Sequence, residues 1–192
     1  MNKIKMIFII ICFSLFYVGC NEFKKTELVW DKIELDSNLK NYDCFKLMDM
    51  DSKYYKKQVS IDSSKYKRNC DIYRALINEK KMNMSSNYFD DFVCETHIVN
   101  DTINVKVCFN TGLSELGVVI NVTNDKYSIH SYNFTDCMGI EKYFPKIKAQ
   151  RLILDKKKYL LGDSIFGIFY LKMIDKFEGA EYWSGDFKCR IN

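Results

Sequence analysis

The sequence is poor in the residues that usually separate domains. One proline, Pro145, occurs in 192 residues, and no stretch rich in glycine, serine or proline divides the chain. Linkers between domains are commonly built from such residues. A chain of this length is also large enough to bury a substantial core on its own. The sequence therefore predicts one globular domain.

Motifs for metal and nucleotide chemistry are lacking as well. The only two histidines are His97 and His130, and no His-x-x-His, Cys-x-x-Cys or aspartate-rich calcium loop occurs. The segment from Gly162 to Gly167 contains two glycines but lacks the lysine of a phosphate-binding loop. We therefore predict no cofactor, no zinc ribbon and no thioredoxin-like site.

Neither sign of charge dominates. The formal net charge is +4, and removal of residues 1–19 would take away two lysines and no acid, leaving +2. This balance argues against nucleic acid as a partner. Small lysine clusters are best explained as solvated loops, with a patch that binds phosphate or lipid headgroups as the alternative. The clusters are Lys24-Lys25, Lys56-Lys57, Lys80-Lys81 and Lys156 to Lys158.

One hydrophobic run is present, but it is too short to cross a membrane. Lys3 and Lys5 precede an almost wholly apolar segment of 13 residues from Met6 to Val18. A spanning helix needs about 20 apolar residues. A basic start followed by a core of this length is typical of a secretory signal peptide.

The end of this run, Val18-Gly19-Cys20, resembles the lipobox of bacterial lipoproteins. The resemblance implies cleavage after Gly19 and fatty acylation of Cys20, for example with palmitate, which would anchor the chain in a membrane. Residues 1–19 would then be the signal peptide, residues 20–40 the lipidated cysteine and its tether, and residues 41–192 the β-rich domain. An ordinary signal peptide that ends near a cysteine and an uncleaved anchor are the alternatives.

The resemblance also predicts a location, the bacterial cell envelope. In that family, a residue such as Asn21 rather than aspartate after the acylated cysteine favours the outer over the inner membrane. The predicted partners are the membrane, through the lipid, and an unidentified protein or glycan.

The cysteine count suits such an oxidising compartment. Eight cysteines occur, of which Cys12 would leave with the signal and Cys20 would carry the lipid. We expect at least one disulfide among the other six, but not the full set, and the sequence leaves the pairing open. The alternative role is that of small buried apolar residues. The six candidates are Cys44, Cys70, Cys94, Cys108, Cys137 and Cys189.

Residues 62–82 show helical periodicity. Asp62 and the two serines after it offer caps, and apolar residues then recur at helical spacing. The pattern predicts one amphipathic helix that covers a sheet. The apolar residues are Tyr66, Cys70, Tyr73, Leu76 and Ile77.

From Phe92 onward the period changes to two. Residues 92–99 and 102–109 alternate, with Asn100-Asp101 between them as a two-residue hairpin turn. This register pairs Ile98 with Ile103. It also places Cys94 and Cys108 on opposite faces, so that these two should not bond to each other. A three-residue turn would set them opposite each other but would mix polar and apolar residues on both faces.

A second hairpin is predicted around Asn124-Asp125, pairing Val122 with Tyr127 and Ile120 with Ile129. Further strands are expected at 149–155, 159–161, 164–174 and 180–191, with a connector at 135–148. The sequence thus predicts an α+β fold that is predominantly antiparallel β, either a sandwich or a partly open barrel.

Both histidines fall on the non-core faces of their strands by this alternation. His97 and His130 are the candidates for a polar site, able to bind a metal or act as a base if the hairpins bring them together. The function we expect is non-catalytic binding of a protein or glycan by a tethered β domain. The alternatives are an inhibitor or immunity lipoprotein against an envelope-attacking enzyme, and a hydrolase or metal-dependent enzyme that uses these histidines.

Overall fold

The computed structural model describes residues 28–48, 69–78, 83–89, 92–110, 112–135, 145–174 and 179–192. The signal segment, Cys20 and Cys137 lie outside these ranges, as does most of the predicted connector at 135–148.

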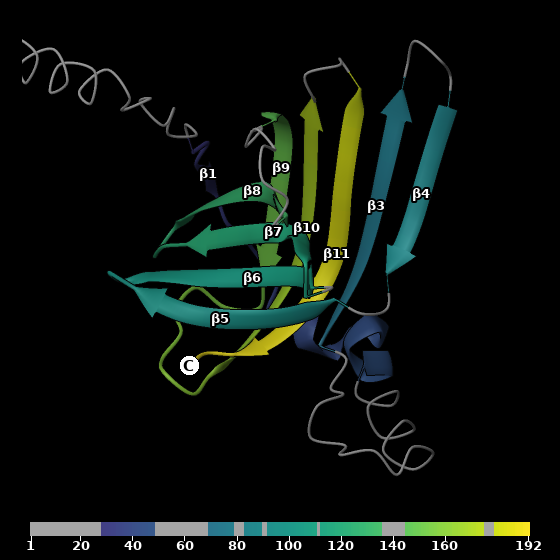
Figure 1. The fold of residues 1–192 in the computed structure, drawn as a ribbon. Coiled ribbons are helices and arrows are strands. Elements are labelled where there is room, and N and C mark those ends of the chain that lie inside the picture. The colour runs from purple at the N-terminus through teal and green to yellow at the C-terminus, as the bar shows by residue number, and fades with distance from the viewer. Residues whose placement is uncertain are drawn as a thin grey trace, which may run out of the picture.

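The described residues form two sheets, and antiparallel pairing dominates both, as the sequence predicts. The five-stranded sheet has the order β1-β8-β7-β6-β5, and the six-stranded sheet has the order β2-β9-β10-β11-β3-β4. The strands of one sheet run across those of the other at a large angle (Figure 1). The strands are β1 (Asp31–Lys32), β2 (Glu34–Leu35), β3 (Cys70–Asn78), β4 (Asn83–Phe89), β5 (Val93–Val99), β6 (Thr102–Asn110), β7 (Ser114–Val122), β8 (Lys126–Thr135), β9 (Lys146–Leu154), β10 (Ser164–Ile174) and β11 (Ala180–Arg190).

The main core lies between the two sheets. Each strand sends alternate side chains inward, which is why the apolar residues of the β segments recur with a period of two. Trp183 and Phe187 on β11 are fully buried there and face aliphatic side chains of the five-stranded sheet. The aliphatic members include Val105, Val107, Val118, Ile120 and Ile129.

The two predicted hairpins are confirmed residue by residue. Ile98 pairs with Ile103 across the β5–β6 turn, and the same register places Cys108 opposite Val93, on the other face from Cys94. Asn100 and Asp101 have φ values of 48° and 61°. Positive φ at both central residues is the signature of the type I′ turn, whose twist matches that of paired strands.

The β7–β8 hairpin also has the predicted register, with Ile120 opposite Ile129 and Val122 opposite Tyr127. The adjacent side chains Asn121 and Ser128 form their own pair on the opposite face.

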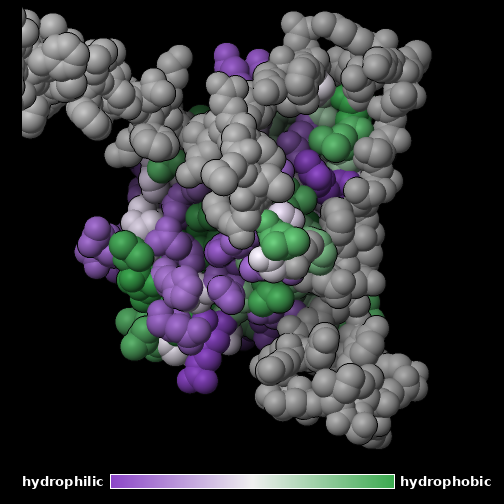
Figure 2. Space-filling view, viewed as in Figure 1, coloured by the Kyte–Doolittle hydropathy of each residue, from purple (hydrophilic) through white to green (hydrophobic). Residues whose placement is uncertain are grey.

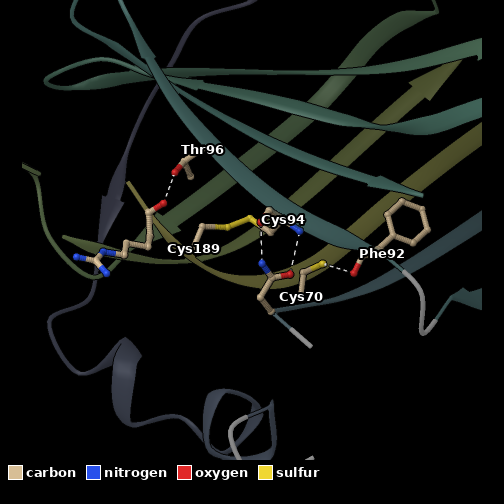
Figure 3. The surroundings of a disulfide bond; sticks show 7 residues. Cys70, Phe92, Cys94, Thr96 and Cys189 are labelled. Atoms are coloured by element: carbon tan, nitrogen blue, oxygen red, sulfur yellow. Dashed lines mark hydrogen bonds between the residues drawn. A yellow bond between two sulfur atoms is a disulfide. The ribbon is translucent and has the colours of Figure 1, made fainter. Parts of the chain in front are cut away.

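One edge of the five-stranded sheet is joined to the six-stranded sheet by a seam of polar and covalent contacts (Figure 3). Cys94 on β5 forms a disulfide with Cys189 on β11. The Asn69 side chain accepts from the Cys94 amide at 2.9 Å and donates to the Cys94 carbonyl at 2.7 Å. Thr96 donates to the Arg190 carbonyl. The prediction of at least one disulfide is therefore confirmed.

The other side of the domain is joined by the N-terminal segment. β1 pairs with β8 in the five-stranded sheet, and β2 then pairs with β9 in the six-stranded sheet. Residues 31–35, which lie within the segment predicted as the tether, therefore belong to the two sheets. With both sides joined, the sandwich is close to a partly closed barrel.

A short helical region follows on the outer face of the six-stranded sheet. A 3-10 turn spans Leu39–Asn41, and an α-helix begins at residue 43. Leu39, Phe45 and Met48 are buried in a second, smaller core. The Phe45 ring meets the Phe166 ring edge-on at 5.3 Å.

The helix predicted at 62–82 is wrong over residues 70–78, which form β3. Cys70 and Ile72 point inward and are buried, whereas Tyr73, the next residue, is exposed on the other face of the strand. The apolar residues of this window fall on both faces of the strand, so that they show helical spacing and no strict period of two. β11 on one side and β4 on the other supply backbone hydrogen bonds, and these decide in favour of a strand.

The strand predicted at 159–161 is also wrong. Residues 155–163 form a loop between β9 and β10, and β9 begins at Lys146, earlier than predicted. The loop is tied to the end of the chain, as shown below.

Candidate functional site: the outer face of the five-stranded sheet

The candidate site is the face of the five-stranded sheet that points away from the main core, here called the outer face. Strand alternation places His97 of β5 and His130 of β8 on it, because their neighbours Thr96 and Ile129 are buried on the inner face. In Figure 2, hydrophilic residues predominate over the area where Figure 1 shows β5, β6 and β7.

The structure does not bring the two histidines together. His97 lies opposite Asn104, which lies opposite Asn121, which lies opposite Ser128 on β8. His130 is two residues further along β8. Three strand spacings separate the histidines, roughly 15 Å. The two hairpins are adjacent, as a joint site requires. The histidines, however, lie on β5 and β8, and β6 and β7 separate these strands.

Lys106, Glu115 and Tyr132 form a charged cluster on the outer face that sequence reasoning missed. Lys106 forms an ion pair with the Glu115 carboxylate, whose side chain is 19% exposed. The Tyr132 hydroxyl donates to the same carboxylate at 2.6 Å. The Lys106 ammonium also lies 5.6 Å from the centre of the Tyr132 ring.

Beside this cluster, the absence of a side chain at Gly117 lets the backbones of β6 and β7 approach closely. Cys108, Gly117 and Tyr132 lie side by side on β6, β7 and β8. A Cβ atom at Gly117 would collide with the Val107 carbonyl oxygen and the Cys108 backbone.

The sequence predicts part of the cluster, because the alternation of β6 and β7 already places Lys106 and Glu115 on one face. The two residues are not directly opposite each other in the strand register, however, and the periodicity of the sequence does not predict such a diagonal contact.

The electrostatics keep Glu115 charged and Cys108 neutral. Burial alone would raise the pKa of Glu115, but hydrogen bonds from Lys106, Tyr132 and Cys108 outweigh it, and the pKa is lowered. Burial, followed by the hydrogen bond to Glu115, raises the pKa of Cys108 to about 11. A thiol with such a pKa is almost wholly protonated at neutral pH and is a poor nucleophile.

His130 is kept neutral by its surroundings. Burial lowers the pKa of its imidazole. Its Nδ1 atom is buried and, as far as the described residues show, has no hydrogen-bond partner. His97 differs in being exposed to solvent.

The other candidate cysteines are spread through the fold. Cys44 lies in the helix that begins at residue 43, where burial and then the Asp186 carboxylate raise its pKa to about 11. Cys70 donates its thiol to the Phe92 carbonyl at 3.2 Å. Together with Cys108 these residues are thiols, so that the expectation of fewer than three disulfides is confirmed.

Within the described ranges, no three His, Cys, Asp or Glu residues are grouped so that they could hold a metal ion. In the same part of the chain no helix has the length and apolar character needed to cross a membrane. Comparisons with known proteins found no matching family model, no similar curated protein and no similar solved structure.

Proposed function

We propose that this chain is a bacterial envelope lipoprotein, tethered through Cys20, whose β domain binds a protein or glycan partner without catalysing a reaction. The proposal combines the N-terminal motif with the nature of the outer face.

The disulfide supports the compartment. Cys94 and Cys189 are 95 residues apart in sequence and join two different sheets. Structural disulfides of this kind form and persist in oxidising compartments such as the bacterial periplasm or cell surface. A chain exported by the predicted signal peptide would fold in such an environment.

The chemistry of the outer face supports binding rather than catalysis. A hydrolase or metal enzyme built on the two histidines needs them within reach of one substrate atom. They lie roughly 15 Å apart by strand spacing. The Cys108 thiol, with its pKa raised to about 11, is not an activated nucleophile.

The observation that carries the proposal is the fixed Lys106–Glu115–Tyr132 cluster on this face. Its three polar groups hold one another in place. Beside it, Glu95 and His97 on the edge strand β5 are exposed. Charged and polar groups that are held in place can recognise a partner by electrostatic complementarity, which gives specificity.

Site-specific crosslinking in the full chain tests this function. A photo-crosslinking residue replaces His97 on the outer face, and in a matched control it replaces Tyr73, which is exposed on β3. We expect a defined protein or glycan adduct from position 97 and none from position 73. The adduct should diminish when Lys106→Met is added.

Two results would contradict the proposal. One is equal labelling from both positions, or none from either. The other is a hydrolytic or metal-dependent activity of the purified chain that is lost in the His97→Ala/His130→Ala double variant. The tether is tested separately by the mass of the N-terminal peptide, which should begin at Cys20 and carry acyl chains.

A further inference from the structure

The loop between β9 and β10 holds two adjacent leucines in solvent. Leu160 is 75% exposed and Leu161 is 74% exposed, a level that among the described large hydrophobic residues only Leu113 shares. A single exposed leucine needs no explanation. Two neighbouring exposed leucines at the tip of a loop with a fixed backbone do need an explanation.

The turn that carries them is fixed by hydrogen bonds within the loop. The Asp163 amide donates to the Leu160 carbonyl at 3.0 Å, and Gly162 has a φ of 88°. Positive φ at the third residue, together with this hydrogen bond, is typical of a type II turn, which favours glycine at that place. The Leu160 amide in turn donates to the Asp163 carboxylate at 2.9 Å.

The loop is also anchored to the rest of the domain, beside the C-terminal end (Figure 1). Gly162 donates to the Ile191 carbonyl at 2.8 Å, and Ile191 donates to the Asp163 carbonyl at 2.9 Å. The Tyr159 hydroxyl donates to Asp155 at 2.7 Å. With its backbone held in this way, the turn cannot fold the two leucines back onto the core.

The charges around the leucines are distributed unevenly. The acidic Asp163 is paired within the loop, because Lys156 donates to it at 2.6 Å. Lys157 and Lys158 are exposed. The exposed Arg190 reaches to within 3.8 Å of the place where a Gly162 Cβ would lie. Two apolar side chains therefore stand among three outward cations.

We propose that this turn inserts Leu160 and Leu161 into the surface of an anionic lipid bilayer, and that Lys157, Lys158 and Arg190 contact the headgroups. Apolar side chains that enter the acyl boundary while cations stay at headgroup level are the basis of interfacial membrane binding. The proposal depends on the proposed tether in one respect: the membrane that the turn contacts would be the one that holds the acylated Cys20.

The geometry of the chain allows both contacts at once. The described chain enters the domain at Val29, whose carbonyl accepts from Gln150 of β9 at 2.8 Å. Gln150 lies about 13 Å along the strand from Leu154, where β9 meets the loop. Residues 20–28, if extended, reach up to about 30 Å. The acylated cysteine and the leucine turn can therefore meet the same surface.

A depth-sensing label tests the insertion. The full chain, purified from membranes, carries Leu161→Cys labelled with an environment-sensitive fluorophore. It is reconstituted into vesicles of phosphatidylcholine with or without phosphatidylglycerol, each containing brominated lipid. The pKa values of about 11 for Cys44 and Cys108 make these thiols slow to react, and the unsubstituted chain serves as the labelling blank. We expect a blue shift and bromine quenching that are strongest with phosphatidylglycerol and weaken in high salt.

Leu113→Cys is the matched control. Leu113 is 76% exposed, and residues 110–114 contain no lysine or arginine. It should report water in both kinds of vesicle. Adding Lys157→Glu/Lys158→Glu to the Leu161→Cys chain should reduce the quenching about tenfold or more. Unchanged thermal unfolding would show that the variant still folds.

The outcomes separate this proposal from the tether. An acylated Cys20 together with a water-like signal at position 161 would overturn the insertion and leave the tether intact. A quenched label on a chain without acyl mass would support the insertion and remove the tether. Quenching equal to that of Leu113→Cys would also overturn the insertion.

Discussion

The Asn69 side chain binds the backbone of Cys94 in both directions, as a neighbouring strand would. Its carbonyl oxygen accepts from the Cys94 amide at 2.9 Å, and its amide nitrogen donates to the Cys94 carbonyl at 2.7 Å. Asn69 precedes β3 of the six-stranded sheet, whereas Cys94 belongs to β5 of the other sheet. One side chain thus satisfies backbone groups at the edge where the two sheets are joined.

Replacing the half-buried Asn69 should therefore destabilise the domain. Asn69→Ala removes both hydrogen bonds and leaves two backbone groups without that partner, which should lower the free energy of unfolding by about 2 kcal/mol. Urea unfolding measures the change. Asn104→Ala is the control, because the hydrogen bond that the described residues show for the Asn104 side chain is a long one, 3.4 Å, within its own hairpin. Equal effects of the two variants would refute the special role of Asn69.

Breaking the Cys94–Cys189 disulfide should destabilise the domain by about 2–5 kcal/mol. Cys189→Ser should lower the unfolding midpoint and make it insensitive to dithiothreitol, whereas the midpoint of the natural chain should fall when the reductant is added. Cys108→Ser is the control, since Cys108 is a thiol and its replacement should leave the response to reductant intact. A natural chain whose midpoint does not respond to reductant would contradict the disulfide.

His130 should make the fold less stable in mild acid. Its folded pKa is lowered by burial, so the unfolded chain binds the proton at higher pH than the folded chain does. Stability is then highest above the unfolded pKa of about 6.5 and falls as the pH drops from there toward the folded pKa. We expect His130→Gln to flatten the loss of stability between about pH 7 and pH 5.

His97→Gln, at the exposed histidine of the same face, is the matched control and should retain the slope of the natural chain. Free energies of unfolding measured across this pH range provide the comparison. An unchanged slope in His130→Gln would show that the buried imidazole is not responsible.

Lys106→Met should raise the pKa of Glu115. Hydrogen bonds from Lys106, Tyr132 and Cys108 hold that pKa below its ordinary value, and removal of the ammonium leaves burial, which raises it, less opposed. Carbon-13 NMR titration of the carboxyl group measures the shift. Because the folded pKa is lowered, the stability that Glu115 contributes is present above its unfolded pKa and is lost as the pH falls through the folded pKa.

The variant should accordingly lose about 1 kcal/mol of stability near pH 7, less than a fully buried pair would cost, because both side chains keep some contact with water. Tyr132→Phe removes one neutral donor and should shift the pKa of Glu115 in the same direction. A pKa unchanged in both variants would contradict the cluster.

The strands that were predicted well are those in which the spacing of the apolar residues fits a strand and does not fit a helix. Residues 92–109 alternate strictly around a two-residue turn, so one register buries one face and no other does. β3 was missed because Cys70, Tyr73 and Leu76 recur at helical spacing, and one of its two ladder partners, β11, is more than a hundred residues away. The candidate histidines were placed on the correct face, but their separation depends on the order of four strands.

The sequence by itself determined the hairpins, the faces of their residues and the presence of cysteines able to pair, because these depend on neighbours within a few residues. It also carries the N-terminal motif on which the proposed tether rests. Only the tertiary structure decided which cysteines meet, how Lys106 reaches Glu115, and where Leu160 and Leu161 are held. Those contacts join residues from separate strands, and their energy exists only once two sheets have packed across each other.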